Sequence, residues 1–348
     1  MAPAYQTLGL ILAQSRPNDP ILVRALQHDL RRLGYLRRGI DGVFGSGTTR
    51  AIRALRYDLL HNDGRGRDGS APVAVNSYNR NRVAAPITDM LDEALAACIG
   101  DMLDDAALPS LPFSNDPARD NSRAIAAIAG AHSAVAPTPF VLAIVLQESN
   151  GLHFAVPRGA DQDDFVIVGL DHASDAPPDQ ITSRGYGIGQ YTLFHHPPSQ
   201  SEIQRFIAEP IGNTNLVYRT LHDKVAVAVP SPDRQAEHPR QPVRLCRYAA
   251  SDPRYLSDCV ACTRQVRRLD INPGTPLYLG APETYQPTQY HPSATYHNVP
   301  DRADFPCDWP YAVRRYNGDG VDSYHYQAQV LPRLLNLPAM TGTAAPTS

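Results

Sequence analysis

The stretch Leu142-Ala-Ile-Val-Leu-Gln-Glu148-Ser149-Asn150-Gly151 decides the fold of the second half of the chain. It predicts a helix over residues 139–150, because Thr138 can cap its start, Pro139 suits its first turn and Gly151 can end it in a left-handed conformation. The residues that precede the glutamate are apolar on every side of this helix, which is typical of a helix buried in a large core. The sequence therefore predicts a mainly α-helical fold around this element.

Glu148 comes at the C-terminal end of the predicted helix. Burial and the partial negative charge of the last carbonyl groups both disfavour an ionised carboxylate there, so we expect its pKa to be raised. A carboxylic acid that stays protonated near neutral pH can donate a proton to the leaving oxygen of a sugar. Glu148 is therefore a candidate general acid of a glycosidase, and the alternative is a solvent-facing side chain where a helix ends.

Length and charge narrow the classes of function. A chain of 348 residues is long enough for about two domains and a large core, and its 32 prolines favour long irregular connections. The net charge of -3 gives no sign of a nucleic-acid partner. We expect no membrane span, because no run of about 18 apolar residues occurs. Residues 1–14 lack the basic region of a secretory signal peptide, so we expect release from the cytoplasm by another route.

The first half contains leucines at helical spacing, followed by a glycine-rich turn over residues 39–45 and a second helix from Thr48. This part of the chain resembles the three-helix peptidoglycan-binding domain family. The resemblance is carried by Val23-Arg-Ala-Leu-Gln27, Leu30, Leu33-Gly34-Tyr35, Asp41-Gly42-Val-Phe44-Gly45, Thr48 and Ala51. An ordinary helix-turn-helix with a tight loop is the alternative interpretation.

This resemblance implies a wall-binding domain over residues 1–106, with a third helix at 87–102 and a proline-rich linker at 107–120. Its partner would be the glycan strands of peptidoglycan. The chain departs from the family after Tyr57, where residues 64–72 look like a flexible insertion. The residues expected to bind the wall are Leu26, Tyr35, Asp41, Phe44 and Thr48.

Three motifs in the second half occur in a fixed order: Glu148-Ser-Asn-Gly151, Gly187-Ile-Gly189-Gln190 and Tyr316-Asn317-Gly318 before a helix at 324–335. Together they resemble the soluble lytic transglycosylase family, which has a lysozyme-like α fold. The resemblance implies a catalytic domain over residues 121–337. Long irregular insertions are expected at 156–183 and 230–308, and a disordered tail at 338–348.

The resemblance also implies roles for the matching residues. Glu148 would protonate the oxygen between N-acetylmuramic acid and N-acetylglucosamine, and would then accept the proton of the sugar's own 6-hydroxyl, giving a 1,6-anhydro end. This route needs one carboxylate and no cofactor, whereas hydrolysis needs two carboxylates. The residues expected to bind and position the substrate are Ser149, Gly189, Gln190, Tyr191, Tyr316 and Asn317.

Alternatives remain open. An aspartate of the first insertion could activate water and make the enzyme a hydrolytic muramidase; the candidates are Asp161, Asp163, Asp164 and Asp171. The chain could also be a non-catalytic wall-binding protein or a chitin-degrading enzyme. We expect a monomer that acts in the periplasm or on the cell wall, delivered either through a holin pore, as phage endolysins are, or by secretion machinery.

Four cysteines lie in or beside the second insertion: Cys246, Cys259, Cys262 and Cys307. Proteins that act outside the cytoplasm commonly form disulfides, so two disulfides are the favoured interpretation. Free thiols and a zinc site are the alternatives. No metal-ligand spacing stands out among the histidines, and we expect no metal.

Overall fold

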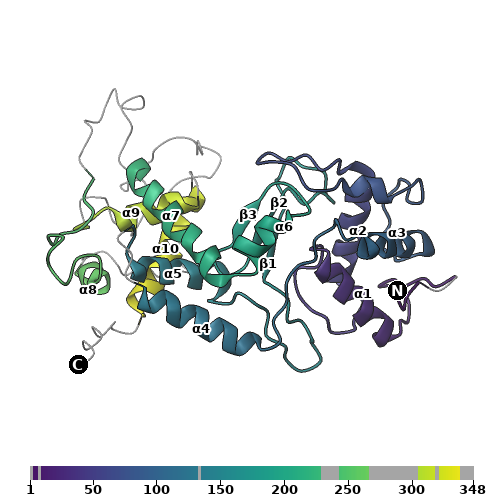
Figure 1. Cartoon of the computed structure of the whole chain (residues 1–348), viewed down its shortest axis with the longest axis horizontal. Coiled ribbons are helices and arrows are strands. Elements are labelled where there is room, and N and C mark those ends of the chain that lie inside the picture. Colours follow the sequence, from purple (N-terminus) through teal and green to yellow (C-terminus); the bar gives the residue numbers. More distant parts are fainter. Residues whose placement is uncertain are drawn as a thin grey trace. The chain divides into compact units, whose positions relative to one another are not determined.

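The computed structural model of the chain describes residues 3–6, 9–131, 135–228, 243–265, 305–317 and 321–337. This part is mainly α-helical, as the sequence predicts (Figure 1). Its packing divides the chain into unit 1, Met1–Ala124 with Leu152–Asn213, and unit 2, Ile125–Gly151 with Thr214–Ser348. The predicted linker at 107–120 does not coincide with this division, and the predicted domain boundaries stay a prediction. The expected disordered tail lies outside the described residues.

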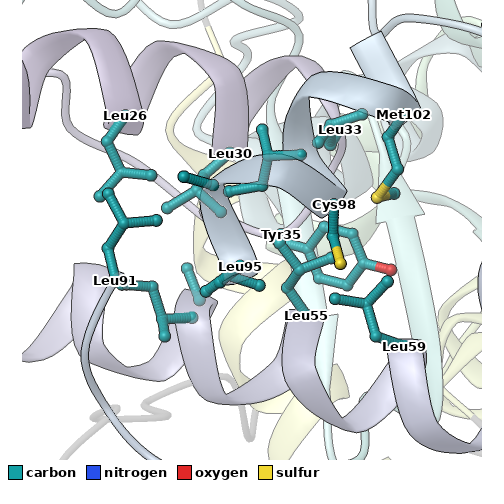
Figure 2. Close-up of a cluster of buried hydrophobic side chains, with 14 of the residues drawn as sticks. Leu26, Leu30, Leu33, Tyr35, Leu55, Leu59, Leu91, Leu95, Cys98 and Met102 are labelled. Atoms are coloured by element: carbon teal, nitrogen blue, oxygen red, sulfur yellow. The ribbon is translucent and has the colours of Figure 1, made fainter. Parts of the chain in front are cut away.

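Unit 1 begins with three helices, α1 (Pro20–Arg32), α2 (Ser46–His61) and α3 (Glu93–Asp104). Asp19 caps α1 because its side chain accepts a hydrogen bond from the Ile21 amide. Leucines of the three helices meet in one buried cluster, which Figure 2 shows. These leucines are among the residues whose spacing predicts the helices, and their burial helps to stabilise this part of unit 1.

The third helix begins later than the sequence predicts, at Glu93 and not at residue 87. Asp92 sets this start, because its side chain accepts the Leu95 amide at 2.9 Å. The insertion expected to be flexible, residues 64–72, is followed by a short 3₁₀ helix, η1 (Val75–Tyr78), that packs against α2 and α3. The flexibility of residues 64–72 stays a prediction.

A small antiparallel sheet completes unit 1, with strand order β1 (Val168–Asp171), β2 (Ser183–Tyr186) and β3 (Tyr191–Leu193). In its register Val168 faces Tyr186. We expected irregular chain over much of this region. After β3 come α6 (Gln200–Glu202) and a π-helical turn, η2 (Ile203–Ile207). Apolar side chains of this part form a second buried cluster, which includes Phe154, Phe165, Val166, Tyr186 and Ile207.

Two buried ion pairs join this sheet region to the first two helices. Arg31 of α1 donates to Asp163 at 2.9 Å, and both side chains are almost completely buried. Arg184 of β2 pairs with Asp58 of α2 at 3.3 Å. Since a buried charge is stable only with a partner, these pairs require the two segments to fold together.

The helices that lie in unit 2 wholly or in part are α4 (Pro117–Gly130), α5 (Thr138–Ser149), α7 (Pro210–Ala228), α8 (Cys259–Arg264), α9 (Trp309–Tyr316) and α10 (Val321–Leu335). The helix of the opening motif, α5, contacts α8, α9 and α10, and α10 also packs on α8 and α9. No helix in the described ranges is both long and apolar enough to span a membrane.

The central helix agrees with its prediction to within one residue at each end. It is buried from Thr138 to Val145 and apolar from Pro139 to Val145, and it is followed by Asn150 and Gly151, whose φ angles are 57° and 74°. Thr138 is not the cap, because Pro137 precedes the helix in the cap position. The Thr138 hydroxyl instead donates to the Ala131 carbonyl at 2.5 Å.

The helix before it, α4, starts at Pro117 and not near Asn121 as the sequence predicts. Asp116 explains the earlier start. Its carboxylate accepts the Arg119 amide at 3.2 Å, and Pro117 suits the first turn of a helix. Asn121 is therefore inside the helix, where its side chain donates to the Phe154 carbonyl.

His195 follows β3 and lies between two carboxylates, Asp68 at 2.9 Å and Glu202 at 3.1 Å. Burial of the ring lowers its pKa, but the two carboxylates outweigh burial, and the net pKa is raised. The ion pairs should therefore stabilise the fold fully below the unfolded pKa of histidine, about 6.5, and this contribution should fade as pH rises through the raised folded pKa.

We expect His195→Gln to lower the free energy of unfolding more at pH 6 than at pH 9, measured by urea unfolding at each pH. Asp68→Asn, which removes one carboxylate, should weaken the same pH dependence. A loss that is equal at both pH values would show that His195 is not protonated in the folded protein.

Candidate functional site

Glu148 lies in the last turn of α5, and Tyr326 of α10 contacts it. The Tyr326 hydroxyl donates to Glu148 Oε1 at 2.5 Å. Tyr326 is buried and Glu148 is partly exposed. The carboxylate is thus held at one oxygen by a side chain of the neighbouring helix while part of the residue stays accessible to a ligand.

Tyr316, at the end of α9, stacks on the Tyr326 ring with centroids 5.9 Å apart and an angle of 14°. Burial raises the pKa of both tyrosines well above the usual range, and the negative charge of Glu148 raises it further. Both phenols therefore stay protonated near neutral pH. The structure thus brings Glu148 and Tyr316 of the predicted site together, with Tyr326 between them in the network of contacts.

The sequence motifs do not identify Tyr326. A signal was nevertheless present, because Tyr326, Val330 and Leu334 recur every four residues and all three are buried. A tyrosine on the buried face of a helix needs a hydrogen-bond partner for its hydroxyl. Glu148 is that partner.

The neighbours of Glu148 fix the end of α5. Gln147 donates to Gln329 of α10 at 2.6 Å and accepts from Arg333 at 2.8 Å. Ser149 is buried and its hydroxyl donates to the Val145 carbonyl at 3.1 Å. Asn317 is the exposed C-cap of α9. The predicted roles of Ser149 and Asn317 toward a substrate stay predictions. Gly318 lies outside the described residues.

The glycine-rich turn Gly185-Tyr-Gly187-Ile-Gly189, which contains the second motif, belongs to unit 1, where Asn213 and His153 hold it. Asn213 accepts the Gly189 amide at 2.7 Å and donates to the Tyr186 carbonyl at 2.7 Å. His153 accepts the Ile188 amide at 3.1 Å. Burial lowers the pKa of His153 to about 4, so its ring stays neutral and can accept this bond. Both side chains are buried and neither was recognised from the sequence.

Gln190 and Tyr191 follow in the same turn. Gln190 has a left-handed backbone, with φ of 51°, which costs a residue other than glycine about 1 kcal/mol. Its side-chain amide donates to the Gly187 carbonyl at 2.8 Å. Tyr191 packs on Phe206 with ring centroids 5.0 Å apart, and burial raises its pKa to about 12. That these residues share a site with Glu148 of unit 2 stays a prediction.

Three of the four aspartates considered for water activation form hydrogen bonds inside unit 1. Asp161 accepts the Ile40 amide at 2.7 Å, Asp163 accepts from Arg31, and Asp171 accepts the Ser183 hydroxyl at 3.1 Å. The fourth, Asp164, is partly buried, and this burial raises its pKa. Hydrogen bonds thus give Asp161, Asp163 and Asp171 structural roles, and the hydrolytic alternative stays a hypothesis.

The four clustered cysteines gather in unit 2 as thiols. Burial raises the pKa of Cys259, and the nearby Cys307, Cys246 and Cys262 raise it further. Within the described residues no group of three or more histidine, cysteine, aspartate or glutamate side chains is arranged to hold a metal ion. The zinc alternative therefore has no support here, and the choice between disulfides and free thiols stays open.

Comparison with known proteins identifies one part of the chain. Residues 21–56 match the family model of the peptidoglycan-binding domain. The matched segment contains most of α1 and α2 and supports association with the cell wall, with peptidoglycan as a partner. Comparisons with curated proteins and with solved structures give no match.

Within the peptidoglycan-binding domain, the residues expected to bind the wall are mostly in the core. Leu26, Tyr35, Phe44 and Thr48 are each no more than 5% exposed. Their burial shows that they build the domain, and their contact with a ligand stays a prediction.

The fifth wall-binding candidate, Asp41, shapes the loop between α1 and α2. Its carboxylate accepts from the buried Gln27 at 2.9 Å, and the same Gln27 amide group contacts Thr48 at 3.2 Å. Gln27 also accepts the Gly42 amide at 2.8 Å. Gln27, which lies inside the quoted motif, therefore fixes the glycine-rich turn, and no ligand is needed to explain these polar residues.

Proposed function

We propose that this protein cleaves peptidoglycan between N-acetylmuramic acid and N-acetylglucosamine, with Glu148 as the single catalytic carboxylate. The observation that carries the proposal is the contact of Glu148 with Tyr326, whose ring stacks on Tyr316, at the end of a buried helix. The same chain contains a peptidoglycan-binding domain, which supports the choice of substrate. The likeness to lytic transglycosylases rests on the sequence motifs alone.

In the first step the Glu148 carboxylic acid donates its proton to the glycosidic oxygen as the bond to the anomeric carbon breaks. In the second step the Glu148 carboxylate takes the proton of the sugar's 6-hydroxyl while that oxygen bonds to the anomeric carbon. The proton that leaves in one step returns in the other, so no water is consumed. Tyr326 keeps the carboxylate in one orientation through both steps, because its hydroxyl stays protonated.

The wall-binding domain serves such an enzyme by tethering. A catalytic domain tethered to an insoluble polymer stays at high local concentration near the next bond. The joined domains therefore cleave the polymer faster than separate domains would. The biological use we propose is bacterial lysis or attack on a rival's wall, with delivery through a holin pore or secretion machinery. We propose that the chain acts as a monomer in the periplasm or on the wall.

Mass analysis of the products tests the proposal. Purified sacculi are incubated with the full chain, and the released muropeptides are weighed. Products with 1,6-anhydro ends are the expected result. Reducing ends would overturn the single-carboxylate route in favour of hydrolysis, and the absence of soluble products would favour a protein that only binds the wall.

Tyr326→Phe tests the positioning of Glu148 and is expected to lower kcat about 10- to 100-fold with little change in KM. The expected size follows from the loss of one hydrogen bond to a charged group, about 1.5–3 kcal/mol. Turnover of soluble glycan strands measures both constants. Tyr248→Phe, which removes another tyrosine hydroxyl that donates to a carboxylate of unit 2, is the matched control. Equal losses for both variants would count against a role of the Tyr326 hydroxyl.

A further inference from the structure

A pocket of about 730 Å³ lies in unit 1, next to α2 and the segment that joins β1 to β2. This volume is in the range of small-molecule and peptide sites. Apolar atoms of Tyr35, Leu36, Ala51, Leu170 and Ile181 contribute to its lining. Only part of this lining lies within residues 21–56, because residues 170–172 and 178–181 form the opposite wall.

Hydrogen bonds fix this opposite wall. Arg53 of α2 forms two bonds to the Asp179 carboxylate, at 2.7 and 2.8 Å. Tyr57 donates to Gln180 at 3.4 Å, and the Gln180 carbonyl bonds the His172 ring at 2.9 Å. The segment between β1 and β2 is therefore held against α2, and the pocket is pre-formed.

Three further arginines line the pocket, Arg37, Arg38 and Arg50, and all three are exposed. The lining also holds two aspartates, Asp171, which accepts the Ser183 hydroxyl, and Asp179, so the arginines outnumber the carboxylates. Within the described part of the chain none of the three forms an ion pair, whereas Arg53 is paired with Asp179. Like charges that gather without partners repel one another, and an anionic ligand would relieve that repulsion. The planar guanidinium group binds a carboxylate through two parallel hydrogen bonds.

We propose that this pocket binds the acidic stem peptides of peptidoglycan through their carboxylates. The proposal rests on the wall association of the proposed function and names the part of the wall that is recognised. The amino sugars offer hydroxyl and acetamido groups, while the stem peptides carry several carboxylates, so the charge of the pocket selects the peptide. Its apolar lining suits the methyl groups of the alanines in the same stem.

The composition of the chain alone does not indicate an anion-binding site, because arginine carries nearly all of its positive charge and exposed arginines therefore also occur away from the pocket. The placement of three unpaired arginines around one pocket is what distinguishes them from the other surface arginines. Polymers that carry phosphodiesters are a different class of ligand with the same charge, and the experiment separates the two.

Calorimetric titration of the full chain tests the proposal, with every protein carrying Glu148→Gln so that no ligand is cut. The first ligand is a disaccharide tripeptide from the wall, the second is the same compound with its stem carboxylates converted to amides, and the third is a glycerol phosphate oligomer. The binding variant is R37Q/R38Q/R50Q. The matched control, R16Q/R119Q/R123Q, removes three exposed charges of unit 1 outside the pocket.

The compound with free carboxylates is expected to bind at least about tenfold more tightly than its amide, since each charge-assisted hydrogen bond contributes about that factor. The binding variant should lose this preference, and the control should keep it. Equal binding of acid and amide, an unchanged binding variant, or tighter binding of the phosphate oligomer would each overturn the proposal.

Sedimentation with intact sacculi separates this proposal from the proposed function. A protein that does not sediment with sacculi removes the wall association and with it the proposed function. A protein that sediments but shows no preference for free carboxylates removes only the stem-peptide pocket.

Discussion

Glu148→Gln is expected to slow glycan cleavage by about a hundred- to ten-thousand-fold, the usual contribution of a general acid or base. An amide has nearly the shape of a carboxylic acid but cannot donate a proton to the glycosidic oxygen or accept one from the 6-hydroxyl. Its oxygen can still accept from Tyr326, so the contact between α5 and α10 should survive. The rate of release of soluble muropeptides from sacculi measures the effect.

We expect Glu148→Gln to keep its stability and its binding to the wall although it loses cleavage activity. The peptidoglycan-binding domain belongs to unit 1 and Glu148 to unit 2, so Glu148→Gln should sediment with sacculi as the wild type does. Glu93→Gln, an exposed glutamate in the first turn of α3, is the matched control and should keep full activity. Equal clearing of sacculi by wild type and Glu148→Gln would remove Glu148 as the acid.

The helices of this protein could be predicted from the sequence because their signals are local. The apolar run of α5, with Pro139 at its start and Gly151 after its end, fixes that helix to within one residue. The helical spacing of Leu26 and Leu30 does the same for α1. The predicted bounds were wrong at helix starts, because a single capping aspartate sets the first residue of the helix, as Asp92 does for α3.

The sheet and part of the candidate site could not be predicted, because they depend on contacts between distant residues. The strands are three or four residues long, too short for an alternating pattern to show. Tyr326 contacts Glu148 across 178 residues of sequence, and Arg31 contacts Asp163 across 132. Sequence motifs made Glu148 and Tyr316 candidates, while the contact of Tyr326 with Glu148 was visible only in three dimensions.

The buried pair of Arg31 and Asp163 gives the largest expected effect on stability. Arg31 also donates to the Leu36 and Val166 carbonyls, at 3.1 and 2.9 Å. Burial lowers the pKa of Arg31, and Asp163 opposes that effect. Asp163→Ala leaves a buried cation without its counter-ion, which should cost about 3–5 kcal/mol of the free energy of unfolding.

Removing both charges should cost less than removing one. In R31M/D163L no buried charge remains unpaired, so we expect this double variant to be more stable than Asp163→Ala, by an amount that measures the coupling of the pair. Asp179→Asn is the matched control in the same unit, because its partner Arg53 is about one-third exposed and such a pair contributes only about 1 kcal/mol or less.

Urea unfolding monitored by circular dichroism measures these differences in stability. Tryptophan fluorescence shows which unit is destabilised. Trp309 is the only tryptophan of the chain and lies in unit 2, so its emission reports on unit 2, whereas circular dichroism reports on both units. Asp163→Ala should therefore shift the dichroism transition to lower urea more than it shifts the Trp309 transition. If Asp163→Ala and Asp179→Asn lower the free energy of unfolding equally, the buried pair does not hold the sheet region to α1. Apolar packing must then be the main interaction that joins the sheet region to α1.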